Sequence, residues 1–118
     1  MNHRDEKLFA VLAPAAERRR LSEFKPQEVA NTAWAFATVN HRDEKLFAAL
    51  ARAAERRLSD FNPQAVANTA WACAAVKLRD EKLFAAVAIA AERRLSHFTV
   101  QGVANTSWAF ATASHRDD

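Results

Sequence analysis

The sequence predicts an all-α fold, an α-solenoid of about three helix–turn–helix repeats of 37–38 residues with about six helices in total. The first observation is that one segment occurs three times, as Phe24–Ala37, Phe61–Ala74 and Phe98–Ala111. A period of about 20–50 residues is typical of arrays in which each unit buries its apolar face only against its neighbours. The repetition therefore favours an extended binding surface over a catalytic pocket.

Composition is the second observation. The 118 residues include one glycine and three prolines, and alanine is abundant. Since glycine and proline break helices and alanine is the best helix former, we expect almost no other secondary structure. The net charge of +3 is compatible with nucleic acid but does not establish it. A single cysteine excludes an internal disulfide and fits a reducing compartment.

Helical periodicity, the third observation, defines two helices per unit. The first is expected from Asp43 to Leu58, because apolar residues from Phe47 to Leu58 form one continuous stripe. The second is expected from Pro63 to Val76. Proline suits the first helical position, and Asn62 before it is a good N-cap, a role that Thr99 can take in the third unit.

The organisation predicted is one domain, 1–118, with repeats at about 3–40, 41–77 and 78–114. Residues 115–118 resemble the start of a truncated fourth repeat. Neither end resembles a polar cap, so we expect a fragment of a longer array or a short piece that associates end to end. The first seven residues are too charged for a signal peptide and contain acids too early for a transit peptide. No apolar run is long enough to span a membrane.

The second helix of each unit has two contrasting sides. The apolar side is expected to hold Val66, Ala67, Ala70, Trp71, Cys73 and Ala74, and the opposite side Gln64, Asn68, Ala72 and Ala75. Small residues permit close approach of a ligand, and amides both donate and accept hydrogen bonds. The amides recur in all three units as Gln27, Asn31, Gln64, Asn68, Gln101 and Asn105. The asparagines either contact bases or bond backbone groups of a neighbouring unit. Because the three asparagines are identical, sequence reading would need varying positions such as Asn40, Lys77 and Ser114.

Arginine pairs end the first helix of each unit: Arg18 and Arg19, Arg56 and Arg57, Arg93 and Arg94. Stacked units would align these pairs about 10 Å apart, in position to follow a phosphate backbone. The alternative is that they only offset helix dipoles and solvate the surface. Trp34, Trp71 and Trp108 can stack on bases, but we expect them to be mainly buried between units.

The sequence contains no motif for catalysis or metal binding. His3, His41 and His115 are separated by whole repeats and would not converge on one metal ion, and Cys73 is expected to be a core residue. No glycine-rich phosphate loop, ligand cluster or nucleophile motif is present. We therefore expect no enzymatic activity, no cofactor and no metal.

Two blocks recur in register: Pro-Gln or its equivalent, followed by Ala-Asn-Thr-x-Trp-Ala at 30–35, 67–72 and 104–109. Together with Asp-Glu-Lys-Leu-Phe and Glu-Arg-Arg, these blocks make the whole chain resemble organellar octotricopeptide and heptatricopeptide repeats. They are also similar to helical repeats of FAST-kinase-like proteins and of kinetoplastid RNA-editing complex subunits. Similar arrays of algae and dinoflagellates are often described as chloroplast translation factors.

The resemblance implies a solenoid that binds single-stranded RNA in a chloroplast or mitochondrion, in RNA processing, stability or translation. Within the family the amide-bearing helix is thought to face the RNA, so the resemblance places the six amides on the ligand side. The physics of helical repeats leaves a protein-interaction scaffold open as an alternative, as well as a non-functional fragment of a longer array.

Overall fold

The computed structural model describes residues 10, 12–15, 21–39, 43–78 and 80–115. All secondary structure in these ranges is helical, without a strand, which confirms the all-α prediction. The α-helices are α2 (Pro26–Thr38), α3 (Glu44–Arg56), α4 (Pro63–Ala75), α5 (Glu81–Arg93) and α6 (Val100–His115). Short 3₁₀ turns, η1 (Leu21–Glu23), η2 (Leu58–Asp60) and η3 (Leu95–His97), precede α2, α4 and α6.

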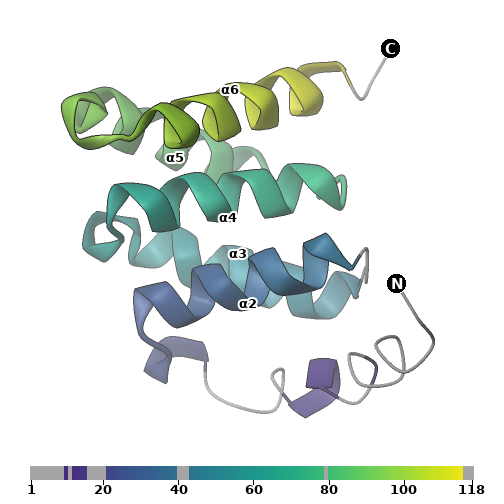
Figure 1. Cartoon of the computed structure of the whole chain (residues 1–118). Helices are drawn as coiled ribbons and strands as arrows, with labels where there is room; N and C mark the ends of the chain where they lie inside the picture. Colours follow the sequence, from purple (N-terminus) through teal and green to yellow (C-terminus); the bar gives the residue numbers. More distant parts are fainter. Residues whose placement is uncertain (1–9, 11, 16–20, 40–42, 79, 116–118) are drawn as a thin grey trace.

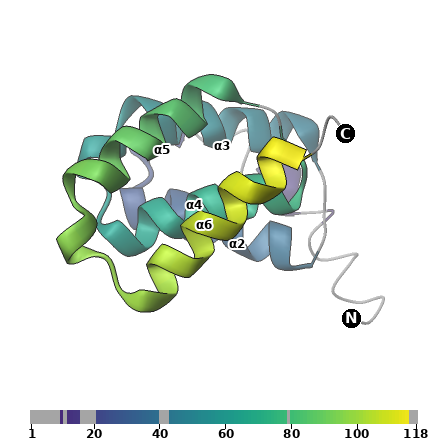
Figure 2. The ribbon, with the colours of Figure 1, turned by 90° about the horizontal axis from the view of Figure 1, so that it is seen from above.

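The helices form two layers. α2, α4 and α6 run side by side in one layer, and α3 and α5 lie behind them in the second (Figures 1 and 2). α4 contacts α2 and α6 extensively, whereas α3 and α5 contact each other over less of their surface. This arrangement is the helical-repeat fold that the sequence predicts. Because the helices of the first layer approach one another more closely, that layer lies on the inner side of the solenoid's curvature.

Side chains at the helix ends explain where the helices begin. Leu58 belongs to η2, so α3 ends two residues earlier than predicted, and α4 begins at Pro63 as predicted. Each cap satisfies a backbone N–H that lacks an intrahelical partner. The caps are Asp43 to the Leu46 N–H (3.0 Å), Asn62 to the Ala65 N–H (2.7 Å), Asp80 to the Leu83 N–H (2.9 Å) and Thr99 to the Gly102 N–H (3.0 Å).

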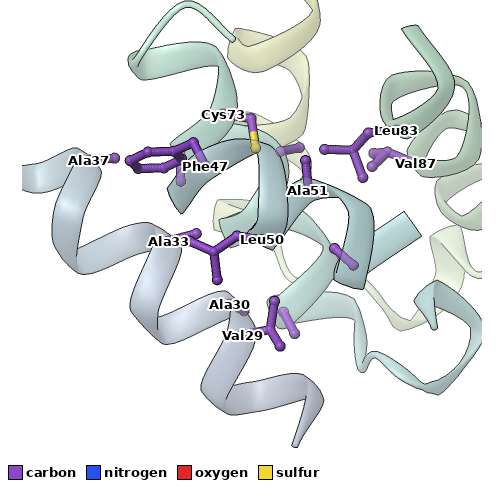
Figure 3. Packing of buried hydrophobic residues seen from close by; sticks show 14 of the residues in the cluster. Val29, Ala30, Ala33, Ala37, Phe47, Leu50, Ala51, Cys73, Leu83 and Val87 are labelled. Atoms are coloured by element: carbon purple, nitrogen blue, oxygen red, sulfur yellow. The ribbon is translucent and has the colours of Figure 1, made fainter. Parts of the chain in front are cut away.

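Larger apolar side chains fill the space between the layers. Phe47 and Leu50 of α3 point toward Ala37 and Ala33 of α2 (Figure 3), and all four are buried. Leucine, phenylalanine and valine thus come mainly from the interlayer stripe of each helix, and alanine fills the narrower spaces within the first layer. The core is one continuous cluster that reaches from Ala13 to Ala109.

Small residues allow the close contact between α4 and α6. A Cβ atom added to Gly102 would lie 3.8 Å from the Cβ of Ala67 and 3.3 Å from the Thr99 hydroxyl. Ala65, which occupies the Gly102 position one repeat earlier, is also buried. The repeat therefore needs a very small side chain wherever a preceding unit lies against this position.

The turn from α4 to α5 contains an unusual lysine. The Leu78 N–H donates to the Cys73 carbonyl (2.9 Å) and the Lys77 N–H to the Ala74 carbonyl (3.0 Å), which is the hydrogen-bond pattern of a Schellman motif. Lys77 has a φ of 62°, in the left-handed region that glycine usually occupies at this point. Lys77 therefore carries a side chain at a position where the backbone conformation favours glycine.

Replacing Lys77 by Gly should raise the free energy of unfolding by about 0.5–1 kcal/mol, because glycine adopts a positive φ without a Cβ clash. Urea denaturation of the two proteins measures the difference. Lys77→Ala is the matched control, since it removes the same side chain and keeps the Cβ atom. If glycine and alanine have equal effects, backbone strain at residue 77 is not the cause.

Within the described ranges, no helix is long and apolar enough to cross a membrane.

Candidate nucleic-acid interface

The six predicted amides lie on the three helices of the first layer. Each glutamine lies in the first turn of its helix, and an asparagine follows four residues later, one turn along the same side. All three glutamines and Asn31 are exposed, and Asn68 and Asn105 are partly exposed. The structure thus brings the amides together on one surface, here called the amide face: Gln27, Asn31, Gln64, Asn68, Gln101 and Asn105.

The amide groups of this face are not used within the protein. No hydrogen bond joins them to another residue in the ranges that the structure describes, whereas Asn62 caps α4 (2.7 Å). The alternative in which the asparagines bond a neighbouring unit is therefore not seen among these residues. Their donors and acceptors face solvent and remain available to a ligand.

The tryptophans extend the same surface, which corrects the expectation that they are mainly buried. Trp34 and Trp108 are each 45% exposed, and Trp71 is partly exposed. The ring centroids of Trp34 and Trp71 are 6.3 Å apart, and those of Trp71 and Trp108 are 5.9 Å apart. The contacts between units were expected, but the buried positions along this side of α4 and α6 hold smaller residues such as Ala72, Ala109 and Thr69. The indole rings therefore lie above the spaces between these helices, in what we call the tryptophan row.

Two alanines assigned to the polar side occupy those spaces instead. Ala72 and its equivalent Ala109 are fully buried, so the expectation that this position faces a ligand is wrong. On α4 the exposed side is narrower than predicted, because α2 and α6 cover both of its flanks and α3 and α5 lie behind it (Figure 2). Within α4, the residues that keep exposed or partly exposed surface are Pro63, Gln64, Asn68, Trp71 and Ala75.

The arginine pairs divide into two kinds. Arg18 and Arg19 lie outside the described residues. A guanidinium N–H of Arg57 donates to the carbonyl of Phe24, and one of Arg94 donates to the carbonyl of Phe61. Each of these bonds spans 33 residues and joins the end of one unit's first helix to the loop before the preceding unit's second helix. Sequence reasoning missed this role, for which regular recurrence of the second arginine was the only signal.

Replacing Arg94 by Ala should lower the free energy of unfolding by about 1–2 kcal/mol, because a partly buried carbonyl loses its charged donor. Arg93 is the matched control, since it is the exposed member of the same pair and Arg93→Ala should change stability by less than about 0.5 kcal/mol. Chemical denaturation provides both values. Equal losses for Arg93 and Arg94 would contradict a specific role for the Arg94 hydrogen bond.

Arg56 and Arg93 are exposed and end helices of the second layer. They do not share the amide face. They do lie on the same side of the molecule as Gln64 and Gln101, where the turns η2 and η3 are. These short turns join α3 to α4 and α5 to α6. A ligand bound on the amide face would therefore meet these arginines at the edge of that face.

The structure places Cys73 in the core, fully buried, as predicted. Burial raises the pKa of the Cys73 thiol to about 12, and the negative charge of Asp80 contributes in the same direction. The thiol is therefore protonated at neutral pH and does not act as a nucleophile. Among the described residues, no group of histidine, cysteine, aspartate and glutamate side chains could hold a metal ion.

These features define the class of the protein: an all-α helical-repeat protein with an exposed face of amides and aromatic rings. The family model of the RNA-editing substrate-binding complex 6 protein matches residues 1–118. The chain belongs to this family, which links it to RNA editing. Comparison with curated proteins and comparison with solved structures each gave no match. The predicted similarity to RNA-editing complex subunits is thus confirmed, and the octotricopeptide or heptatricopeptide type stays a prediction.

Proposed function

We propose that this chain binds single-stranded RNA on the amide face. The observation that carries the proposal is that six amides on three adjacent helices face solvent with no hydrogen-bond partner among the described residues. Unpaired bases offer donors and acceptors on their edges, and amides can match either kind of group. A duplex hides the Watson–Crick edges of its bases, so the amide face suits single strands, in which those edges are accessible.

The identity of the amides from unit to unit sets the expected specificity. Each second helix presents one glutamine and one asparagine at the same two positions. Three equal sites cannot select three different bases, so the proposed binding is tolerant of sequence. Affinity then depends on the number of units that the strand crosses.

Electrostatic attraction has a secondary role in this proposal. The net charge is only +3, and Arg57 and Arg94 each use one N–H for a carbonyl of the protein. Arg56 and Arg93 are the arginines whose exposure suits contact with phosphates at the edge of the face. We therefore expect a shallow salt dependence, since each neutralised phosphate contributes a slope of about −0.7 for single strands.

The family suggests the biological setting. We propose that the chain acts with RNA and with other proteins in a mitochondrial RNA-editing assembly, and that processing, rather than stability or translation, is its task. It would act as a binding subunit, not an enzyme, and without a cofactor.

Fluorescence anisotropy of a labelled single-stranded oligouridine of about twelve nucleotides, titrated at several salt concentrations, tests the proposal. We expect binding that is tighter than to duplex DNA and that weakens with salt. The double variant Arg56→Ala, Arg93→Ala should flatten the salt dependence. A folded, helical protein that binds no RNA would overturn the proposal.

A protein-interaction scaffold is the second candidate, favoured by the apolar side chains at the α5–α6 end of the solenoid. Ile89 (51%), Leu95 (57%) and Val103 (41%) are all exposed there. Recovery of a protein partner after nuclease treatment, lost on Leu95→Glu, together with no RNA affinity, would favour this candidate.

A further inference from the structure

A hollow of about 480 Å³ opens beside the last tryptophan of the row. It lies near the C-terminal ends of α4 and α6, where α6 rises away from α4 (Figure 1). Trp108, Ala111 and Thr112 line it from α6, and Ala74 and Lys77 line it from α4 and the following turn. Its volume is within the range of about 300–1,000 Å³ that suits small ligands.

Trp108 gives this hollow an aromatic wall. Trp71 contacts a ring on each side, at 6.3 and 5.9 Å, but Trp108 contacts a tryptophan only on the side of Trp71. Its indole is the end of the row and is 45% exposed. Because Trp108 both lines the hollow and is partly exposed, a planar group that enters the hollow can stack on the exposed part of the indole.

Lys77 gives the same hollow a positive charge. The side chain is exposed, and no carboxylate in the described ranges forms an ion pair with it. A second hollow of about 320 Å³ lies on the other side of the turn and is lined by Asp43 and Glu44 as well as by Lys77. Those two carboxylates would repel a phosphate, whereas no acidic residue lines the Trp108 hollow among the described residues.

We propose that the Trp108 hollow holds one unpaired nucleotide of the bound RNA, with its base stacked on Trp108 and its phosphate beside the Lys77 ammonium. Thr112 offers a hydroxyl to the sugar or the base edge. This inference rests on the proposed function, because the nucleotide belongs to the strand on the amide face. Lys77 and Thr112 both occupy positions that vary between repeats, and one repeat earlier the corresponding residues are Asn40 and Ala75.

The test compares two tryptophans that occupy equivalent positions and are equally exposed. Trp108→Ala should weaken binding of the labelled oligouridine about 5- to 100-fold with an unchanged salt slope, since one stacking contact is lost. Trp34→Ala removes a ring from the other end of the row, and Trp34 lines neither the Trp108 hollow nor the hollow beside Asp43 and Glu44. Its affinity should change by less than about threefold. Trp108→Phe should retain most of the affinity because it keeps an aromatic surface.

Two further variants separate stacking from damage to the fold. Ala111→Phe fills the hollow without changing charge and should weaken binding as Trp108→Ala does. Lys77→Gln should lower the magnitude of the salt slope by about 0.7. Circular dichroism and thermal unfolding show whether each variant is folded.

The outcomes distinguish this inference from the proposed function. If the wild-type protein binds RNA and neither Trp108→Ala nor Ala111→Phe weakens binding more than Trp34→Ala does, the hollow holds no nucleotide and the RNA-binding proposal survives. If the folded wild-type protein binds no RNA, both fail.

Discussion

Replacing Leu58 by Ala is expected to lower the free energy of unfolding by about 2–4 kcal/mol, and the same replacement at Leu95 by less than about 1 kcal/mol. The two leucines occupy the same position in successive repeats. Leu58 is 5% exposed and Leu95 is 57% exposed. Removing a buried leucine leaves a cavity and loses the free energy of burying apolar surface. A half-exposed leucine leaves a smaller cavity and buries less apolar surface, so its removal costs less.

Urea denaturation of both variants measures this difference, provided that the slope with denaturant stays equal. Val66 and Val103 form a second equivalent pair, with exposed fractions of 0% and 41%, for use if Leu58→Ala does not fold. Equal losses within a pair would contradict the arrangement in which each unit is covered by the next.

Replacing Asn31, Asn68 and Asn105 together by Ala is expected to weaken RNA binding about 100-fold. Each asparagine is free to form at least one hydrogen bond with the strand, and such a bond contributes about 0.5–1.5 kcal/mol. The variant should be as stable as the wild type or more so, because alanine favours the helix. Fluorescence anisotropy with the labelled oligouridine and urea denaturation measure the two quantities.

Asn62 is the matched control for this variant. Its side chain caps α4 by accepting a hydrogen bond from the Ala65 N–H (2.7 Å). Asn62→Ala should therefore lower the free energy of unfolding by about 1 kcal/mol and leave the RNA affinity of the folded protein unchanged. If the triple variant binds RNA normally, or loses stability as Asn62→Ala does, the amides do not form the binding surface.

Most of the fold follows from local features of the sequence. The apolar stripe around Phe47 and the cap at Asn62 predict helices whose bounds agree with the structure to within two residues at α3 and one at α4. The exception at the end of α3 arises because Leu58 to Asp60 form a 3₁₀ turn, and a stripe of apolar residues continues through such a turn without a break.

The candidate site was predictable only in part. The amides share one side of each helix, so helical spacing alone brings them together. The exposure of Trp71 and the burial of Ala72 depend instead on how closely α2, α4 and α6 approach, which is a property of neighbouring units rather than of one helix. At these two positions, the size of the side chain therefore determines whether it is buried or exposed more than its polarity does.

The left-handed backbone conformation of Lys77 was not predicted from the sequence. Its position varies between repeats, with Asn40 and Ser114 as its equivalents, and asparagine is the residue that most often joins glycine at a positive φ. That substitution pattern was a signal for a left-handed turn. The hollow beside it, however, is lined by residues of α4, the following turn and α6, so it depends on how helices of neighbouring units are placed.

Ultraviolet crosslinking of the protein to a single-stranded oligouridine, followed by mass spectrometry of the crosslinked peptides, tests the central claim most directly. If the RNA lies on the amide face, the crosslinked residues fall within Pro26–Thr38, Pro63–Ala75 and Val100–His115, or at Lys77 in the turn after α4. Crosslinks confined to Glu44–Arg56 and Glu81–Arg93 would place the RNA on the second layer and contradict this account.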